Sequence, residues 1–171
     1  MPDSESAHQH KQSAAARGPV RIAIITVSDS RTPATDTNAH YLREAIAAAG
    51  HIVSSYRLIR DEPLQVAAVL EELIADSQIL LWNGGTGISP RDTTYDALSA
   101  KLDKTLPGFG EIFRMLSYNQ IGSPAMMSRA TAGVYKGRVV ISTPGSPNAV
   151  KLAWEKLILP EIAHLAWEVA R

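Results

Sequence analysis

The chain contains no cysteine among its 171 residues. It therefore has no disulfide bond, no thiolate metal site and no cysteine nucleophile. It also lacks an excess of either charge, because 17 Lys and Arg residues balance 17 Asp and Glu residues. Without a basic surface nothing favours a nucleic-acid-binding function, and we expect no nucleic acid partner.

Long apolar runs are missing as well. No stretch approaches the ~18 consecutive apolar residues of a membrane span, and the N-terminus lacks the apolar core of a signal peptide. We therefore expect a cytoplasmic protein with no membrane partner. Residues 1–19 are polar and rich in Ala, Ser, Gln and His, which predicts a flexible tail. Residues 20–171 are numerous enough to bury the core of one α/β domain.

The most informative stretch runs from Gln78 to Asp92 and reads QILLWNGGTGISPRD. Its apolar part predicts a buried strand, and the glycines at 84, 85 and 87 allow positive φ angles and a close approach of a ligand. Thr93 and Asp96 fit the start of a helix. A strand, a glycine loop and a helix start form the usual phosphate site of open α/β sheets. The loop matches neither the P-loop nor the dinucleotide pattern, so a tight strand-to-helix turn explains the glycines equally well.

Other polar loops also follow apolar segments. A strand predicted over residues 21–27 leads into Ser28, Asp29 and Ser30, and one over 138–142 leads into residues 143–147. A third predicted strand, over 51–59 and near a sheet edge, precedes Asp61. The carboxyl ends of parallel strands meet at one edge of a sheet, so these loops should surround one crevice. A plain serine turn and a helix N-cap role for Asp61 are the structural alternatives.

Helical periodicity fills most of the remaining chain. It predicts helices over residues 38–49, 63–74, 95–102, from 107, over 148–159 and from 160, with another strand over 128–134. The resulting order, β-α-β-α-β-α-α-β-β-α, predicts a mostly parallel sheet covered on both faces.

Asp61 and Asp92 are carboxylates beside loops that could bind an anion. Such a pair suits Mg²⁺ shared with the phosphates of a nucleotide. The glycine loop would hold the phosphates while the metal offsets their charge during transfer. We therefore predict catalytic and metal-binding roles for both aspartates, and a place in a turn is the structural alternative for Asp92.

Taken together, the motifs resemble the MogA/MoaB family of molybdenum cofactor biosynthesis proteins, which includes the G domain of gephyrin and its plant counterpart. The likeness extends from residue 21 to the C-terminus. The motifs that carry it are TVSD (26–29), GGTGISPRD (84–92), PGFGEIFR (107–114), SRATAGV (128–134) and PGSPNAV (144–150). HYLR at 40–43 and FRMLS at 113–117 favour the MoaB branch.

This resemblance implies a three-layer α/β/α fold, a homotrimer or homohexamer, and an adenylyltransferase activity. ATP, with Mg²⁺, would be the co-substrate and molybdopterin the substrate, adenylated before metal insertion. Asp61 and Asp92 match the two aspartates that the family uses in catalysis. The remaining matched positions are the nucleotide-phosphate loop, Gly84, Gly85, Thr86 and Gly87, and the residues near the pterin, Ser128, Pro144, Gly145 and Ser146. Ser28 and Asp29 are candidate ligand-binding residues at the same edge, and Ser146 departs from the asparagine common in the family.

Two other functions stay open. One is a MoaB-type molybdopterin-binding protein without nucleotidyl transfer, since that branch is implied to include inactive members. The other is a general module for a phosphorylated ligand, such as a flavin-binding protein. The apolar residues over 121–127 and the stripe of Phe109 and Phe113 predict a subunit interface. Packing of these residues on their own sheet is the simpler alternative.

Overall fold

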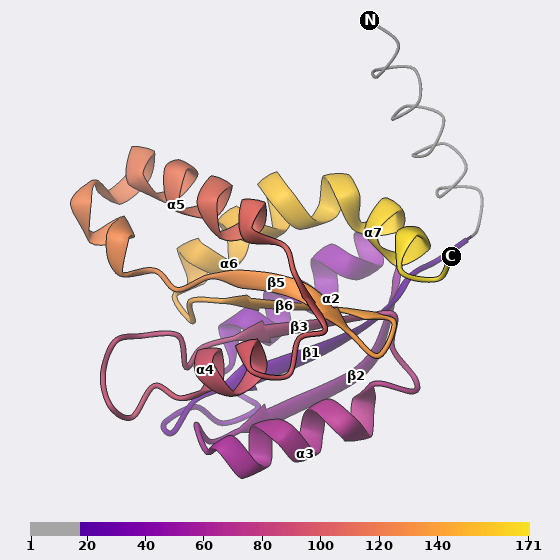
Figure 1. Ribbon diagram of the computed structural model, residues 1–171, viewed down its shortest axis with the longest axis horizontal. Coiled ribbons are helices and arrows are strands. Elements are labelled where there is room, and N and C mark those ends of the chain that lie inside the picture. Colours follow the sequence, from indigo (N-terminus) through magenta and orange to yellow (C-terminus); the bar gives the residue numbers. More distant parts are fainter. Residues whose placement is uncertain (1–17) are drawn as a thin grey trace, which may run out of the picture.

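A six-stranded sheet with the strand order β2-β1-β3-β6-β5-β4 runs through the computed structural model, which describes residues 18–171 (Figure 1). Strands β2, β1, β3 and β6 are parallel, and β5 runs antiparallel to both β6 and β4. The sheet is therefore mostly parallel, as predicted. The strands are β1 (Arg21–Val27), β2 (Ile52–Ile59), β3 (Ile79–Asn83), β4 (Lys104–Thr105), β5 (Thr131–Tyr135) and β6 (Arg138–Thr143).

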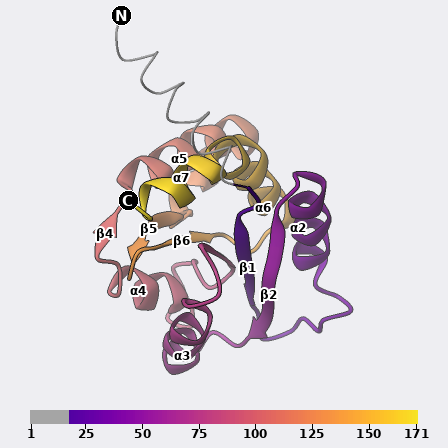
Figure 2. The same cartoon turned by 90° about the vertical axis from the view of Figure 1, so that its right-hand side faces the viewer.

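Helices cover both faces of the sheet and confirm the three-layer α/β/α fold (Figures 1 and 2). One face carries α3 (Pro63–Leu73) and α4 (Thr94–Ser99). The other face carries α2 (Thr37–Ala48), α5 (Pro107–Ile121), α6 (Pro147–Ala153) and α7 (Ile162–Glu168). Alternation along β1 sends Ile22 and Ile24 to this second layer, while Ala23 and Ile25 face α3.

Two short segments of the chain differ from the sequence prediction. Strand β5 begins at Thr131 rather than at residue 128, because the N–H of Ser128 is already bonded to Ala125 O. That bond closes the 3₁₀ turn η1 (Ser123–Met127). The two-residue strand β4 was not expected, and it pairs with Gly133 and Val134.

The C-terminal helices are also less regular than predicted. Between α6 and α7 lie a π-helical turn, η2 (Trp154–Ile158), and a 3₁₀ turn, η3 (Leu159–Glu161). Pro160 has no N–H to donate to the preceding turn, so a regular α-helix cannot pass through it.

Residues 1–17, which make up most of the predicted tail, lie outside the described residues. Within residues 18–171, no helix is both long enough and apolar enough to cross a membrane. Strand β2 lies at one edge of the sheet, as expected.

Helix α3 offers a matched test of this packing. Leu70 is 1% exposed on its sheet-facing side, whereas Leu64 is 86% exposed on the same helix. We expect Leu70→Ala to lower the free energy of unfolding by about 2–5 kcal/mol, because it leaves a cavity in the core. Leu64→Ala should change it by less than about 0.5 kcal/mol. Urea unfolding of both variants measures this, and similar losses would contradict the orientation of α3.

Candidate functional site

The loops that follow β1, β3 and β6 meet at the carboxyl ends of these strands, on the left in Figure 1. Gly84 lies at the centre of this contact. Its N–H donates to Thr143 O at 3.0 Å, and a Cβ atom on Gly145 would lie 3.1 Å from its Cα. Gly84 has a φ of 103°, and a Cβ atom there would overlap the carbonyl of Val27. The three loops therefore touch through backbone atoms, and a side chain at Gly84 would separate them.

Two buried asparagines connect the same loops. Asn83 Nδ2 donates to Ile25 O at 3.2 Å and to Thr26 Oγ1 at 3.0 Å. Its Oδ1 accepts a 2.8 Å bond from Asn38 Nδ2, which also donates to Gly145 O at 2.9 Å. Sequence reasoning missed this network. The available signal was an asparagine at the end of an apolar strand, where a buried amide needs partners.

The loop after β1 is anchored by Asp36, which is completely buried. Asp36 accepts bonds from Ala39 N at 3.1 Å, Tyr56 Oη at 2.8 Å and Arg31 Nη1 at 3.4 Å. Burial and the bond to Asp36 raise the pKa of Tyr56 to about 12, so its hydroxyl remains a donor near neutral pH. Arg31 Nη2 extends the connection by donating to Gly145 O at 3.3 Å.

Asp61 binds the start of α4. Its Oδ1 accepts bonds from the hydroxyls of Thr93 at 2.9 Å and Thr94 at 2.8 Å, and the N–H of Thr93 lies 3.2 Å from the same oxygen. The alternative N-cap role was wrong, because Glu62 occupies the cap position of α3. The predicted start of α4 is correct, although the Thr93 hydroxyl makes no cap bond to that helix.

Both aspartates lie directly against the glycine loop. A Cβ atom on Gly85 would be 2.6 Å from Asp61 Oδ2, and one on Gly87 would be 2.6 Å from Asp92 Oδ2. Gly85 also has a φ of 65°. These glycines thus serve a turn and also let carboxylates approach the backbone, so the turn alone does not explain them. The structure brings Asp61 and Asp92 to loop residues only two positions apart.

Ser28 and Asp29 have partners of their own. Ser28 Oγ accepts bonds from the N–H groups of Ser30 at 3.3 Å and Arg31 at 3.2 Å, which is the serine turn considered as the alternative. Asp29 Oδ2 accepts hydrogen bonds from Arg91 Nη2 at 2.6 Å and from Arg91 Nε at 3.1 Å. The hydrogen bond from Arg91 holds the pKa of Asp29 below its ordinary value. Asp29 is thus an ionised carboxylate already paired with a cation.

The remaining predicted positions lie at the same edge. Ser146 Oγ accepts a 3.3 Å bond from Ala149 N and caps α6. Ser128 precedes β5, and its carbonyl accepts a 3.3 Å bond from Arg114 Nη1. Sequence reasoning quoted Arg129 within a motif but did not single it out, and in the structure it contacts the glycine loop.

The donor set fits a magnesium ion that arrives with a nucleotide. Mg²⁺ prefers oxygen ligands and is commonly held by one or two carboxylates together with phosphates and water. Asp61 and Asp92 supply two such carboxylates beside the loop. Asp92 Oδ2 also accepts a 3.2 Å bond from Ser89 N, which is the turn considered as the alternative for this residue. Within the described part of the chain, no group of three His, Asp or Glu residues gathers into a metal site. The residues therefore fit a metal shared with phosphates better than a metal held by protein alone.

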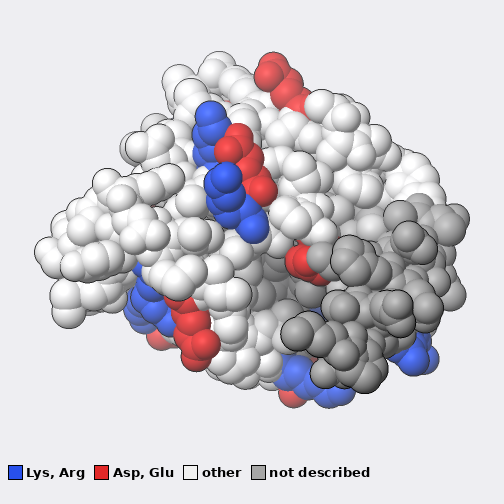
Figure 3. Space-filling view, turned by 90° about the horizontal axis from the view of Figure 1, so that it is seen from above, with Lys and Arg blue, Asp and Glu red and all other residues white. Residues whose placement is uncertain are grey.

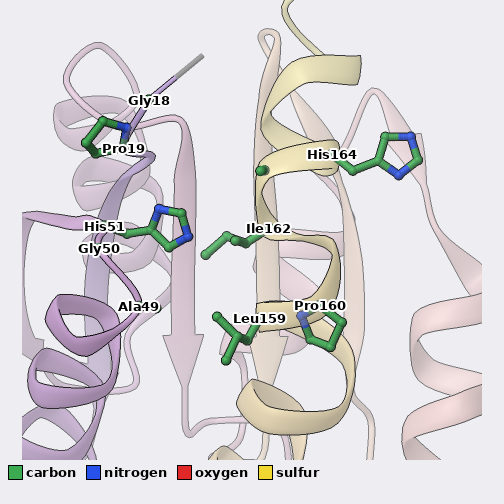
Figure 4. Close-up of a pocket in the computed structure, with 10 residues that line it drawn as sticks. Gly18, Pro19, Ala49, Gly50, His51, Leu159, Pro160, Ile162 and His164 are labelled. Atoms are coloured by element: carbon green, nitrogen blue, oxygen red, sulfur yellow. The ribbon is translucent and has the colours of Figure 1, made fainter. Parts of the chain in front are cut away.

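A cavity of about 580 Å³ lies at the opposite end of the sheet, between the turn that precedes β2 and the segment around α7 (Figure 4). Figure 4 shows His51 and Ile162 pointing into the gap, whereas the ring of His164 points away from it. Burial lowers the pKa of His51, which favours its neutral form. None of the described residues that line the cavity is Asp, Glu, Lys or Arg.

Comparisons with known proteins agree on one family. A family model described as a probable molybdopterin binding domain matches residues 23–164. The chain is 47% identical over 169 residues to molybdenum cofactor biosynthesis protein B of Bacillus cereus, covering 97% of this chain and 99% of that protein. A crystal structure of a molybdenum cofactor biosynthesis protein B has a TM-score of 0.87 at 47% identity, covering 90% of this chain and 97% of that one. The tungsten cofactor synthesizing protein MoaB from Pyrococcus furiosus has a TM-score of 0.81 at 32% identity, covering 90% and 98%.

Replacing Gly85 tests the contact between the glycine loop and Asp61. We expect Gly85→Ala to cost at least about 1–2 kcal/mol of unfolding free energy, because its φ is positive and the new methyl group would displace Asp61. Gly108→Ala is the control, since an added Cβ there would meet nothing within 4 Å beyond its chain neighbours and the backbone of its own helix. That variant should be neutral or gain up to about 1 kcal/mol from helix propensity. Denaturant unfolding measures both, and wild-type stability of Gly85→Ala would contradict the contact.

Proposed function

This chain belongs to the molybdopterin-binding domain family of molybdenum cofactor biosynthesis proteins, and from that premise we propose that it is a molybdopterin adenylyltransferase that uses ATP and Mg²⁺. The observation that carries the proposal is the position of Asp61 and Asp92 against the glycine loop. Two carboxylates beside a loop rich in backbone N–H groups suit a nucleotide that carries a metal ion.

In the proposed reaction, a phosphate oxygen of molybdopterin attacks the α-phosphorus of ATP. A new P–O bond forms, the bond to the β-phosphate oxygen breaks, and pyrophosphate leaves. A phosphate monoester, with a second pKa of about 6, is already anionic near neutral pH. The reaction therefore requires no nucleophilic side chain and no histidine base. It requires positioning of the two phosphates and neutralisation of their charge.

The chain supplies these two requirements from different loops. The backbone from Gly84 to Gly87 would donate N–H groups to the nucleotide phosphates, and Ser128 with residues 144–146 would lie on the pterin side. Asp61 and Asp92 would hold Mg²⁺, which supplies charge neutralisation when bound. The hydroxyls of Thr93 and Thr94 bind Oδ1 of Asp61 and fix the orientation of its carboxylate, while Oδ2 faces Gly85.

Replacing either aspartate by asparagine tests the proposal. Asp61→Asn and Asp92→Asn each keep the size of the side chain and remove its charge. We expect either change to slow formation of adenylated product by roughly a hundredfold or more, because charge neutralisation is lost in the transition state. Molybdopterin binding should persist, since it uses other loops.

Asp103→Asn is the matched control. Asp103 Oδ2 accepts a 2.7 Å bond from Lys136 N beside the turn between β5 and β6, away from the glycine loop. This variant should keep the wild-type rate. Near-wild-type turnover in both Asp61→Asn and Asp92→Asn would refute the two-aspartate mechanism.

A molybdopterin-binding protein without nucleotidyl transfer is the second candidate. The family comparison favours it, because the model that matches residues 23–164 is described as a probable molybdopterin binding domain. A wild-type protein that binds molybdopterin tightly but forms no adenylated product from Mg-ATP would favour this candidate.

We also propose a homotrimer or homohexamer, built on an apolar surface of α5 and η1. The predicted interface needs a correction, because Phe113 is completely buried against its own sheet and Phe109 is partly buried against the same core. The outer side of α5 exposes other residues instead, and Figure 3 shows few charged side chains on this face. The exposed apolar residues are Ile112, Met115, Tyr118, Ile121, Met126 and Met127. An apolar patch of this kind is typical of a subunit interface.

A charge on this surface should disrupt the assembly. We expect light scattering to give the mass of a trimer or hexamer for the wild type at micromolar concentration, and a smaller species for Met115→Glu. Leu64→Glu, which adds the same charge at an exposed position on α3, should leave the assembly intact. A monomeric wild type would contradict the proposed oligomer.

A further inference from the structure

Arg129 lies between η1 and β5 and holds the glycine loop through three backbone carbonyls. Its Nε donates to Thr86 O at 3.0 Å. Its Nη2 donates to Gly87 O at 2.6 Å and to Asp92 O at 3.1 Å. The guanidinium thus connects the first part of the loop to its last residue, which shapes the segment into a closed turn.

The other side of the guanidinium is anchored on α4. Nη1 lies 3.0 Å from both carboxylate oxygens of Asp96, and the group stacks 4.6 Å from the centre of the Tyr95 ring. A guanidinium has five N–H donors, and the contacts to the three carbonyls and to Asp96 engage all three of its nitrogens. Arg129 is therefore directed mainly at acceptors within the protein. Its contacts orient the protein backbone.

These contacts also fix the direction of the N–H groups of the loop. The C=O and N–H of a trans peptide unit point in opposite directions, and no cis peptide occurs within the described residues. The carbonyls of Thr86 and Gly87 face Arg129, so the following N–H groups, those of Gly87 and Ile88, point away from it. The peptide unit after Asp92 shows the same geometry, because its carbonyl accepts from Arg129 while the N–H of Thr93 donates to Asp61.

We propose that Arg129 is a positioning residue that turns the N–H groups of Gly87 and Ile88 towards the phosphates of the bound ligand. The peptide unit that follows Asp92 lies between this arginine on its carbonyl side and the carboxylate of Asp61 on its N–H side. Lysine cannot replace the arginine here, because a single ammonium group cannot span three carbonyls and a carboxylate. The inference rests on the proposed function in that it takes the ligand to be a nucleotide polyphosphate.

Arg129→Lys tests the proposal in two independent ways. Without ligand, amide hydrogen exchange in the segment 86–93 should become at least about tenfold faster, because the charged hydrogen bonds that order the loop are lost. With ligand, the dissociation constant for Mg-ATP should rise at least about tenfold, while that for molybdopterin changes little. In Arg129→Ala, added guanidinium ion should restore part of the Mg-ATP affinity, and ammonium ion should not.

Arg138→Lys is the matched control. Its guanidinium also binds a backbone carbonyl, that of Ile74 at 3.1 Å, but at the opposite end of the sheet. This variant should keep wild-type exchange in the segment 86–93 and wild-type affinity for Mg-ATP. If Arg129→Lys does not fold, Asp96→Asn provides a milder test. It weakens the anchor of the guanidinium, so a smaller change in the same direction is expected.

The outcomes separate this inference from the proposed function. If the wild type does not bind Mg-ATP, the proposed function fails. In that case the role of Arg129 is still decided by amide hydrogen exchange in the segment 86–93 and by the affinity of wild type and variant for pyrophosphate. Wild-type exchange and wild-type affinity in Arg129→Lys would overturn the positioning role. A uniform loss of protection across the whole sheet in that variant would overturn it too, because it would show a general structural role.

Discussion

The absence of a side chain at Gly84 is the constraint on which the site depends. Its backbone touches the ends of β1 and β6 at once, through Val27, Thr143 and Gly145. Van der Waals contact of this kind leaves no room for a methyl group, and the positive φ independently favours glycine. Because three loops meet at this point, the positions of the proposed phosphate loop and of the proposed pterin loop are coupled. A shift in one would move the other.

Buried polar groups then keep these loops in register. Burying an amide or a carboxylate costs free energy unless its hydrogen bonds are made inside the protein. Hydrogen bonds offset this cost for both residues. Asn83 bonds to β1 and to α2, and Asp36 bonds to β2 and to α2. The partners belong to different elements, so the bonds form only when the sheet and α2 are correctly assembled. The polar network thus makes the geometry of the site a consequence of the completed fold.

Much of this architecture follows from local patterns. Apolar runs that end in polar loops predict parallel strands with ligand loops at one edge, and the motifs at 26–29, 84–92 and 144–150 point to the family that the comparisons confirm. The partners of Asp61 could not be predicted, because Thr93 is 32 residues away and reaches it only in the folded chain. The periodicity of α5 marked Phe113 as apolar but could not tell a sheet contact from a subunit contact. Arg129 could not be singled out for a related reason. It binds three backbone carbonyls, and every residue type has a carbonyl, so the sequence does not show which ones an arginine will contact.

The proposed phosphate site beside Asp61 and Asp92 is tested most directly by the structure of a complex with Mg²⁺ and α,β-methylene-ATP, in which the bond that adenylyl transfer would break cannot be cleaved. We expect phosphate oxygens within hydrogen-bond distance of the N–H groups of the glycine loop, with both aspartates on the side of the metal ion. Phosphates bound elsewhere, for example in the cavity beside His51 and Ile162, would contradict the proposed site.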